Sequence, residues 1–182
     1  FTIDLGGGGL YTLDLNTGAP TLVCSTGISG WQGVASDPTD EGQFYGITQS
    51  DDLYQIDRTD CTTERVNAKA GTVGGLIAAL EFDANGTLWG AEFGDPGSTT
   101  ENAALVTIDK TTGAVTVVSQ CATRPCSAGS DNFADGFQGL DFSTDGTLYG
   151  QNTNDDSLYI IDTTDGSLTF LGSNSTIFVK GL

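Results

Sequence analysis

The feature of the sequence that most constrains the fold is a short pattern that recurs four times. In each copy a strand-like apolar segment ends in an aspartate, at residues 10–14, 53–57, 105–109 and 158–162. Successive copies lie about 40 to 50 residues apart, a spacing typical of chains built from repeated supersecondary units. The sequence therefore predicts a repeat architecture.

Two further patterns complete each repeat. Aromatic–glycine pairs stand upstream, at Tyr45-Gly46, Trp89-Gly90 and Tyr149-Gly150, each after an acidic turn. Earlier still lies a strand of small and apolar residues, at residues 33–35, 78–82 and 139–142. Alternating β-branched and aromatic residues bounded by Asn-Gly or Asp-Gly predict β-hairpins, and no window has a convincing helical period. We expect four strands in each unit and name them a to d from the centre outward.

These repeats predict an all-β protein, a β-propeller with four four-stranded antiparallel blades. We expect a single domain over residues 1–182, with blades at 1–27 plus 175–182, 28–71, 72–127 and 128–174. The first unit begins near its strand b, whereas the C-terminal residues match a strand a: Phe178, Val179, Lys180, Gly181 and Leu182. Because a missing strand leaves backbone groups unpaired, we expect this segment to complete the first blade of its own chain or of a neighbour.

The pattern Gly-Leu-x-Phe-x-x-Asp-Gly-Thr-Leu-Tyr-Gly at residues 139–150, with the Leu-Tyr-x-Ile-Asp-x-x-Thr-Gly pattern of strand c, resembles known repeats. It is similar to the blades of secreted bacterial and archaeal β-propellers of the quinoprotein-like and lactonase-like kind. The resemblance covers essentially the whole chain and implies the blade fold. It implies no particular activity, since propellers serve binding, scaffolding and catalysis alike. Relatives of this kind commonly have more than four blades.

The charge balance excludes several classes of function. The chain has 24 acidic and 6 basic residues, a formal charge of −18, and no histidine. A surface with so much negative charge repels phosphate backbones, which argues against nucleic-acid binding. Because the chain has no histidine, chemistry that needs an imidazole side chain is excluded. No apolar run is long enough to span a membrane. The expected partners are other copies of the chain, an extracellular protein or a glycan.

The four cysteines indicate an oxidising compartment. Cys121 and Cys126 are close enough for a local disulfide, which the even cysteine count favours over half a zinc site. The repeat register places Cys24 at the far end of a strand d and Cys61 in a c–d turn, about 20 Å apart on opposite faces. Three explanations remain open: a wrong register, free cysteines, or a link between two molecules.

Other features agree with an extracellular or cell-surface protein. The chain starts at Phe1 without a leader, as a mature or excised product would. Asn85 and Asn174 stand in glycosylation triplets, although Asn-Gly at residues 85–86 is also a turn sequence.

Carboxylates on the expected long loops are candidates for a calcium site: Asp51, Asp52, Asp95, Asp131, Asp135, Asp155 and Asp156. Calcium takes about six to eight oxygen ligands, but no segment matches an EF-hand loop. We favour solvated loop charge, and expect no cofactor. The aspartates that close the repeated segments are expected to cap the following turns: Asp14, Asp57, Asp109 and Asp162.

Recurrent aromatic residues on strands a and b are expected to fill the space between blades: Trp31, Phe137, Phe178, Tyr45, Trp89 and Tyr149. No residue stands out as catalytic. We predict a non-catalytic extracellular structural or interaction protein that self-assembles head to tail into a filament or surface layer. The first alternative is a monomeric propeller that binds a glycan, calcium or a protein on its b–c and d–a loops. The second is a carboxylate-based hydrolase.

Overall fold

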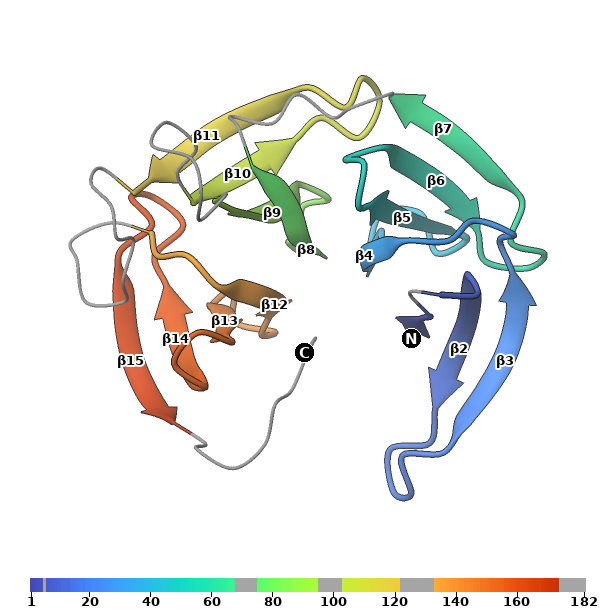
Figure 1. Cartoon of the computed structure of the whole chain (residues 1–182), viewed down its shortest axis with the longest axis horizontal. Coiled ribbons are helices and arrows are strands. Elements are labelled where there is room, and N and C mark those ends of the chain that lie inside the picture. Colours follow the sequence, from blue (N-terminus) through green and yellow to red (C-terminus); the bar gives the residue numbers. More distant parts are fainter. Residues whose placement is uncertain (5, 68–74, 95–102, 122–132, 174–182) are drawn as a thin grey trace.

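The computed structural model describes residues 1–4, 6–67, 75–94, 103–121 and 133–173. Within these ranges all regular structure is β-strand (Figure 1). No helix there is long and apolar enough to cross a membrane. The predicted all-β class is confirmed.

Four antiparallel sheets, each a simple meander, form the blades. Blade 1 contains β1 (Thr2–Ile3), β2 (Gly9–Leu13) and β3 (Pro20–Ser25). Blade 2 contains β4 (Trp31–Ser36), β5 (Gln43–Thr48), β6 (Leu53–Asp57) and β7 (Thr63–Asn67). Blade 3 contains β8 (Leu76–Phe82), β9 (Leu88–Phe93), β10 (Ala104–Ile108) and β11 (Val115–Gln120). Blade 4 contains β12 (Phe137–Phe142), β13 (Leu148–Asn152), β14 (Ser157–Ile161) and β15 (Leu168–Ser173).

The blades stand around a common centre, with β4, β8 and β12 innermost and β3, β7, β11 and β15 along the rim (Figure 1). This is the four-bladed β-propeller that the repeats predict. In blade 1 the described residues supply three strands, in the order β1-β2-β3. The predicted C-terminal strand, Phe178 to Leu182, lies outside the described residues, as does Asn174.

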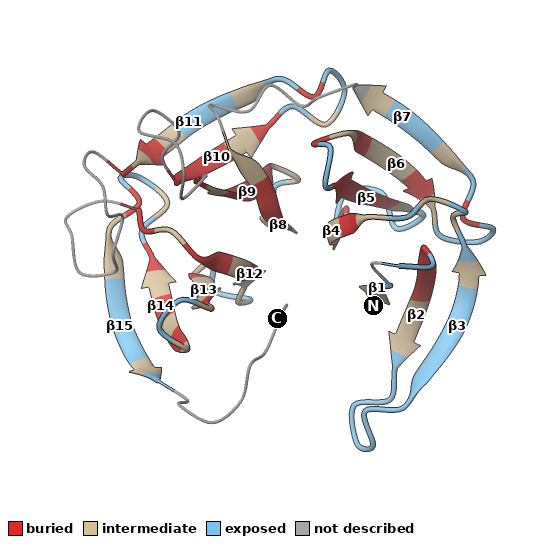
Figure 2. Ribbon diagram, viewed as in Figure 1, coloured by how far each residue is buried: buried red, intermediate tan, exposed pale blue. Residues whose placement is uncertain are grey.

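The core lies between blades. Inner strands are mostly buried and rim strands are largely exposed (Figure 2). Each pair of adjacent blades shares a cluster of buried apolar residues. Tyr45 meets Phe82 of the next blade edge to face, and Trp89 meets Phe142 in the same way. The inter-blade role predicted for the recurrent aromatic residues is confirmed for these two.

The prediction for Cys24 and Cys61 requires a correction. They form a disulfide within one chain, with Cα atoms 5.7 Å apart, so both free cysteines and an intermolecular link are wrong. The register itself was right, because Cys24 lies near the end of β3 and Cys61 in the β6–β7 turn. The predicted separation of about 20 Å is wrong because it holds only for strands that run straight from one face of the propeller to the other. Strand twist accumulates across a blade, so β3 runs along the rim and its end meets the next blade (Figure 1).

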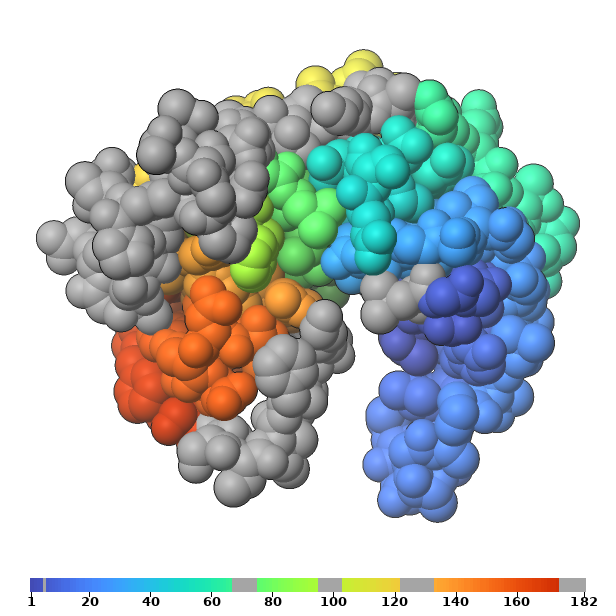
Figure 3. All heavy atoms as spheres, in the orientation of Figure 1, coloured from blue at the N-terminus to red at the C-terminus, as the bar shows by residue number. Residues whose placement is uncertain are grey.

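The described blades form an open arc. Contacts join blade 1 to blade 2, blade 2 to blade 3 and blade 3 to blade 4, but no described strand of blade 4 contacts a described strand of blade 1. Blade 1 and blade 4 stand at the two ends of this arc (Figure 3). The two end blades therefore each have one broad face that no described strand of another blade covers.

Candidate functional site

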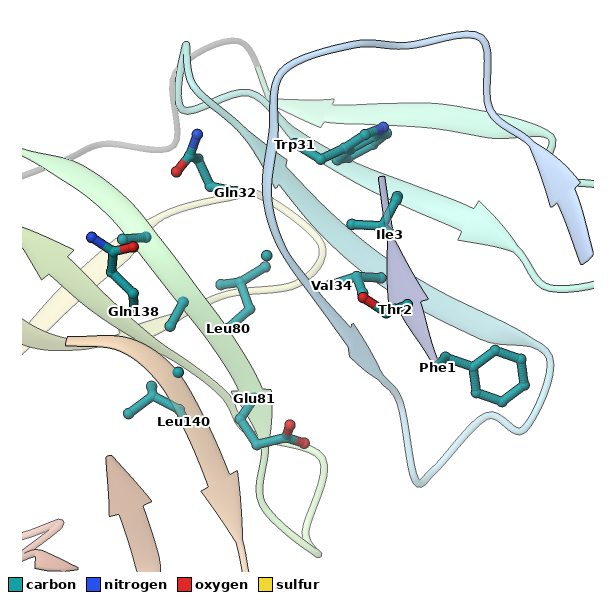
Figure 4. A pocket seen from close by; sticks show the side chains of 14 residues that line it. Phe1, Thr2, Ile3, Trp31, Gln32, Val34, Leu80, Glu81, Gln138 and Leu140 are labelled. Atoms are coloured by element: carbon teal, nitrogen blue, oxygen red, sulfur yellow. The ribbon is translucent and has the colours of Figure 1, made fainter. Parts of the chain in front are cut away.

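A cavity of about 150 Å³ opens at the centre of the arc. Strands β1, β4, β8 and β12 supply its walls, which are largely backbone and aliphatic side chains (Figure 4). Its polar side chains include Gln32, Gln138 and Glu81. Gln32 and Gln138 lie toward one end of the cavity, and Glu81 lies toward the other (Figure 4).

The two glutamines occupy the same place in successive repeats. Each inner strand has a register shift against its neighbour, and the extra residue is Gln32 in β4, Ala78 in β8 and Gln138 in β12. A β-bulge redirects the side chain of the extra residue. The bulges thus place one residue from each described inner strand beside the cavity, and two of the three carry carboxamides.

Glu81 is the ionisable side chain of the cavity with the most perturbed titration. Burial is the main reason that its pKa is raised to about 7. The backbone N–H of Phe82 donates to the carboxylate and partly opposes this rise, and the charge of Asp141 on the adjacent inner strand adds to it. A carboxyl with such a pKa exchanges its proton near neutral pH. No sequence pattern sets Glu81 apart, because it is one acid among 24.

Three of the candidate calcium ligands contact partners in different parts of the described chain. Asp51 accepts a hydrogen bond from the N–H of Ile77, and Asp135 accepts one from the N–H of Gly94, both in a neighbouring blade. Asp52 pairs with Arg65 at 3.7 Å. Within the described ranges no three acidic or cysteine side chains are grouped as metal ligands.

Two of the remaining candidates share one loop, and two are not described. Asp155 accepts a 2.6 Å hydrogen bond from the hydroxyl of Tyr159. Burial, with this bond, raises the pKa of that phenol to about 12. Asp156 takes a positive φ of 54° in the same loop. Asp95 and Asp131 lie outside the described residues.

The four aspartates that close strand c cap the next turn, as predicted. Each carboxylate accepts the N–H of the residue two positions on, for example Thr111 for Asp109 and Thr164 for Asp162. These backbone bonds lower the pKa of Asp14 and Asp109. For Asp57 and Asp162, hydrogen bonds from the threonine side chains of the turn lower the pKa most, and the backbone N–H groups add to the effect. Asn85 is exposed in the β8–β9 turn, where Gly86 has φ 82°, so the turn chemistry predicted there is confirmed.

A charged contact that the sequence did not predict joins blades 2 and 3. Lys110 Nζ lies 2.5 Å from Asp37 Oδ2, and the Asp37 side chain is almost fully buried. Although burial opposes ionisation, the Lys110 ammonium and Thr39 hold the pKa of Asp37 below its usual range. With the Cys24–Cys61 bridge, every junction in the arc has a polar or covalent link besides its apolar cluster.

Cys121 is also disulfide-bonded and buried. Its predicted partner, Cys126, lies outside the described residues.

The uncovered face of blade 1 carries apolar side chains at positions that are buried elsewhere. Leu13 is 43% exposed, whereas its equivalents in the other repeats are at most 4% exposed: Ile56, Ile108 and Ile161. Leu22 pairs with Tyr11 on the same face and is 55% exposed. This face has the composition of a blade–blade contact without a described blade against it.

The uncovered face of blade 4 shows the same mismatch. Leu158 is partly exposed, although the equivalent Leu53 and Leu105 are fully buried. Tyr149 is partly exposed too, at the position of the buried Tyr45 and Trp89. Nearby, Gln151 Oε1 is buried without a hydrogen-bond partner, the one such atom in the described part of the chain.

No protein-family model and no curated protein matches the chain, but solved structures do. A protein of unknown function from Bacteroides thetaiotaomicron superposes with a TM-score of 0.68 at 16% identity, over 96% of this chain and 45% of its own. A chain of the nidogen–laminin complex gives a TM-score of 0.58 at 12% identity, over 95% of this chain and 75% of its own. An auxiliary nutrient binding protein from the same Bacteroides species gives 0.57 at 12% identity, over 96% and 43%.

The chain is a β-propeller. Identities this low show the fold alone, so the resemblance to a particular kind of secreted propeller stays an expectation. The propeller described here spans less than half the length of two of these three structures.

Proposed function

We propose that the chain is a non-catalytic extracellular interaction protein that associates with further copies of itself through the two ends of its blade arc. The observation that carries this proposal is the pair of uncovered end faces, of which Leu13 is the clearest example. Soluble proteins seldom leave such apolar patches uncovered unless something binds there. The disulfides support an oxidising, extracellular setting.

The C-terminal segment belongs to the same proposal. Within the chain, the residues after each rim strand lead into strand a of the next blade. In the proposed assembly, the residues after β15 therefore add to the edge of β1 in the next copy that no described strand pairs with. Strand addition of this kind gains main-chain hydrogen bonds and fixes the register of the two molecules.

Sedimentation velocity across a range of concentrations tests self-association. We expect species heavier than one chain that grow with concentration, and negative-stain images that show linear arrays. Reducing agent should leave the contacts between molecules intact, because Cys24 and Cys61 pair within one chain. A single monomeric species at every concentration would show that the proposal is wrong.

Proline substitutions test the C-terminal strand. Adjacent residues of an edge-paired strand alternate in donating to the ladder, so Val179→Pro and Lys180→Pro should differ: one removes a hydrogen bond to β1 and the other does not. We expect one of the two to reduce the assembled fraction with an unchanged melting temperature. If both proline variants assemble as the parent chain does, the segment does not pair with the next copy. The same conclusion follows if a variant lowers the melting temperature while the mass of the assembled species is unchanged.

A second candidate function is the binding of a small polar ligand in the central cavity. The bulged Gln32 and Gln138 favour it, because two carboxamides beside a titratable carboxyl offer both donors and acceptors. The cavity has room for only a few ligand atoms. Calorimetry with monosaccharides and with calcium would test it, and the double variant Gln32→Ala/Gln138→Ala should abolish any heat observed. Hydrolysis by carboxylates would need a second acid at a defined distance from Glu81, and the geometry supports it less.

A further inference from the structure

The end face of blade 1 and the end face of blade 4 are opposite sides of a blade. This difference indicates which surface each of them fits. In strand c the residues alternate between the two sides of a blade. Leu105 belongs to the cluster shared with blade 4, whereas Val106 and Ile108 belong to the cluster shared with blade 2. Each blade thus has a leading face, which packs on the next blade, and a trailing face, which packs on the previous one.

Blade 1 leaves its trailing face uncovered. Leu10 packs against blade 2 and is fully buried, so its leading face is used. Tyr11 and Leu13 correspond to Val106 and Ile108 and lie on the other side. Blade 4 is the opposite case: Tyr159 and Ile161 pack against blade 3, and its leading face, with Tyr149, Gln151 and Leu158, is the uncovered one.

We propose, building on the self-association above, that the leading face of blade 4 in one copy packs against the trailing face of blade 1 in the next. This contact repeats the three blade junctions inside the chain, each of which joins a leading face to a trailing one. Apolar side chains stand at the equivalent positions on both sides.

A contact between two different faces is heterologous, so a copy that has bound one neighbour still has its other face free. Such contacts build either a ring of copies or an open filament. A dimer with twofold symmetry, in which the same face meets itself, would stop at two copies. The mode of growth therefore separates this arrangement from other ways in which the molecule could self-associate.

The test uses two variants that each block one face. Leu13→Asp places a charge on the trailing face of blade 1, and Leu158→Asp places one on the leading face of blade 4. Each variant alone should associate on the order of tenfold more weakly, or worse, because burying an unpaired charge at the centre of a contact is costly. An equimolar mixture should form a dimer and nothing larger, since the mixture contains exactly one intact face of each kind per pair.

Controls separate a blocked face from a damaged fold. Leu15→Asp changes a leucine in the β2–β3 turn that is 97% exposed. It should assemble like the parent chain. If either aspartate variant lowers the melting temperature, Leu13→Ser and Leu158→Ser replace them.

Three results would overturn the inference. Variants that assemble as the parent does would show that these faces are not used; self-association itself would stand, but not its route through the ends of the arc. A variant that still forms a closed dimer by itself would indicate a face that meets itself. A monomeric parent chain would remove both this inference and the proposed function.

Discussion

Carboxylates of the described chain either cap a nearby turn or join two blades. Asp109 caps its turn, Asp51 holds the N–H of Ile77, and Asp37 pairs with Lys110. The turn-capping role could be predicted from sequence because it depends on residues two positions apart. The other two roles could not, because their partners come from another blade and lie far away in the chain.

Glu81 predicts a pH dependence of stability with an unusual sign. Its folded-state pKa of about 7 lies above the ordinary value of 4.5, so the folded protein holds a proton that the unfolded chain releases. This contribution is complete below about pH 4.5 and is lost as the pH rises through 7, at up to about 1.4 kcal/mol per pH unit. The Glu81→Gln variant should lack this pH-dependent loss of stability. At pH 8 its unfolding free energy should therefore exceed that of the parent chain.

Urea unfolding between pH 4 and 8 measures this difference. Asp141→Asn should shift the loss of stability to lower pH, because Asp141 helps to raise the pKa of Glu81. Glu64→Gln, on the exposed part of β7, serves as the matched control and should run parallel to the parent chain. Parallel curves for Glu81→Gln as well would contradict the prediction.

At the scale of the strand, the glycine after each recurrent aromatic residue makes room for a neighbour. A Cβ at Gly46 would lie 2.5 Å from a ring carbon of Trp31, and one at Gly150 would lie 2.5 Å from Ile161 Cδ1. At Gly90 the nearest atoms are side-chain methyl carbons at 3.2 Å. The sequence shows the repeated aromatic–glycine pair, but only the structure shows which side chain fills the space.

Alanine substitutions at these three glycines should therefore differ in cost. We expect Gly46→Ala and Gly150→Ala to lose about 2 to 3 kcal/mol of unfolding free energy, because rigid or buried side chains must move. Gly90→Ala should lose about 1 kcal/mol or less, since methyl groups can shift by a few tenths of an ångström and alanine restricts the unfolded chain. Equal losses at all three sites, in chemical denaturation, would argue against this packing.

The Cys24–Cys61 bridge combines a covalent link with an unfavourable backbone. Cys61 has φ 59° at the turn position where the other repeats have Gly18, Gly113 and Gly166. Closing a loop of 37 residues restricts the unfolded chain, so Cys24→Ala/Cys61→Ala should lose about 4 kcal/mol. Cys24→Ala/Cys61→Gly should lose about 1 kcal/mol less, because glycine tolerates positive φ. Thermal unfolding of both variants checks the order, and a reversed order would show that backbone strain at Cys61 is negligible.

On the scale of the whole molecule, the sequence predicted the blades and their order, because repeat spacing and turn residues are local properties. It did not predict where the end of one rim strand meets the next blade, as the two cysteines show. That meeting point depends on twist summed over a whole sheet, which no short pattern records. The central cavity could not be predicted for a related reason. The bulges at Gln32 and Gln138 depend on how the strands pair, and the sequence around each glutamine does not indicate a bulge.

Charge should govern how readily copies associate. Each chain carries a formal charge of −18, so two copies repel, while the proposed contact is apolar and gains nothing from opposite charges. Screening shortens the range of this repulsion from about 10 Å at 0.1 M ionic strength to about 3 Å at 1 M. Association measured by sedimentation should therefore strengthen with sodium chloride. A contact built on ion pairs would weaken instead.

Calcium chloride at the same ionic strength provides the comparison. Equal strengthening of the association indicates screening alone, and a clear excess would mean that calcium bridges carboxylates on neighbouring copies.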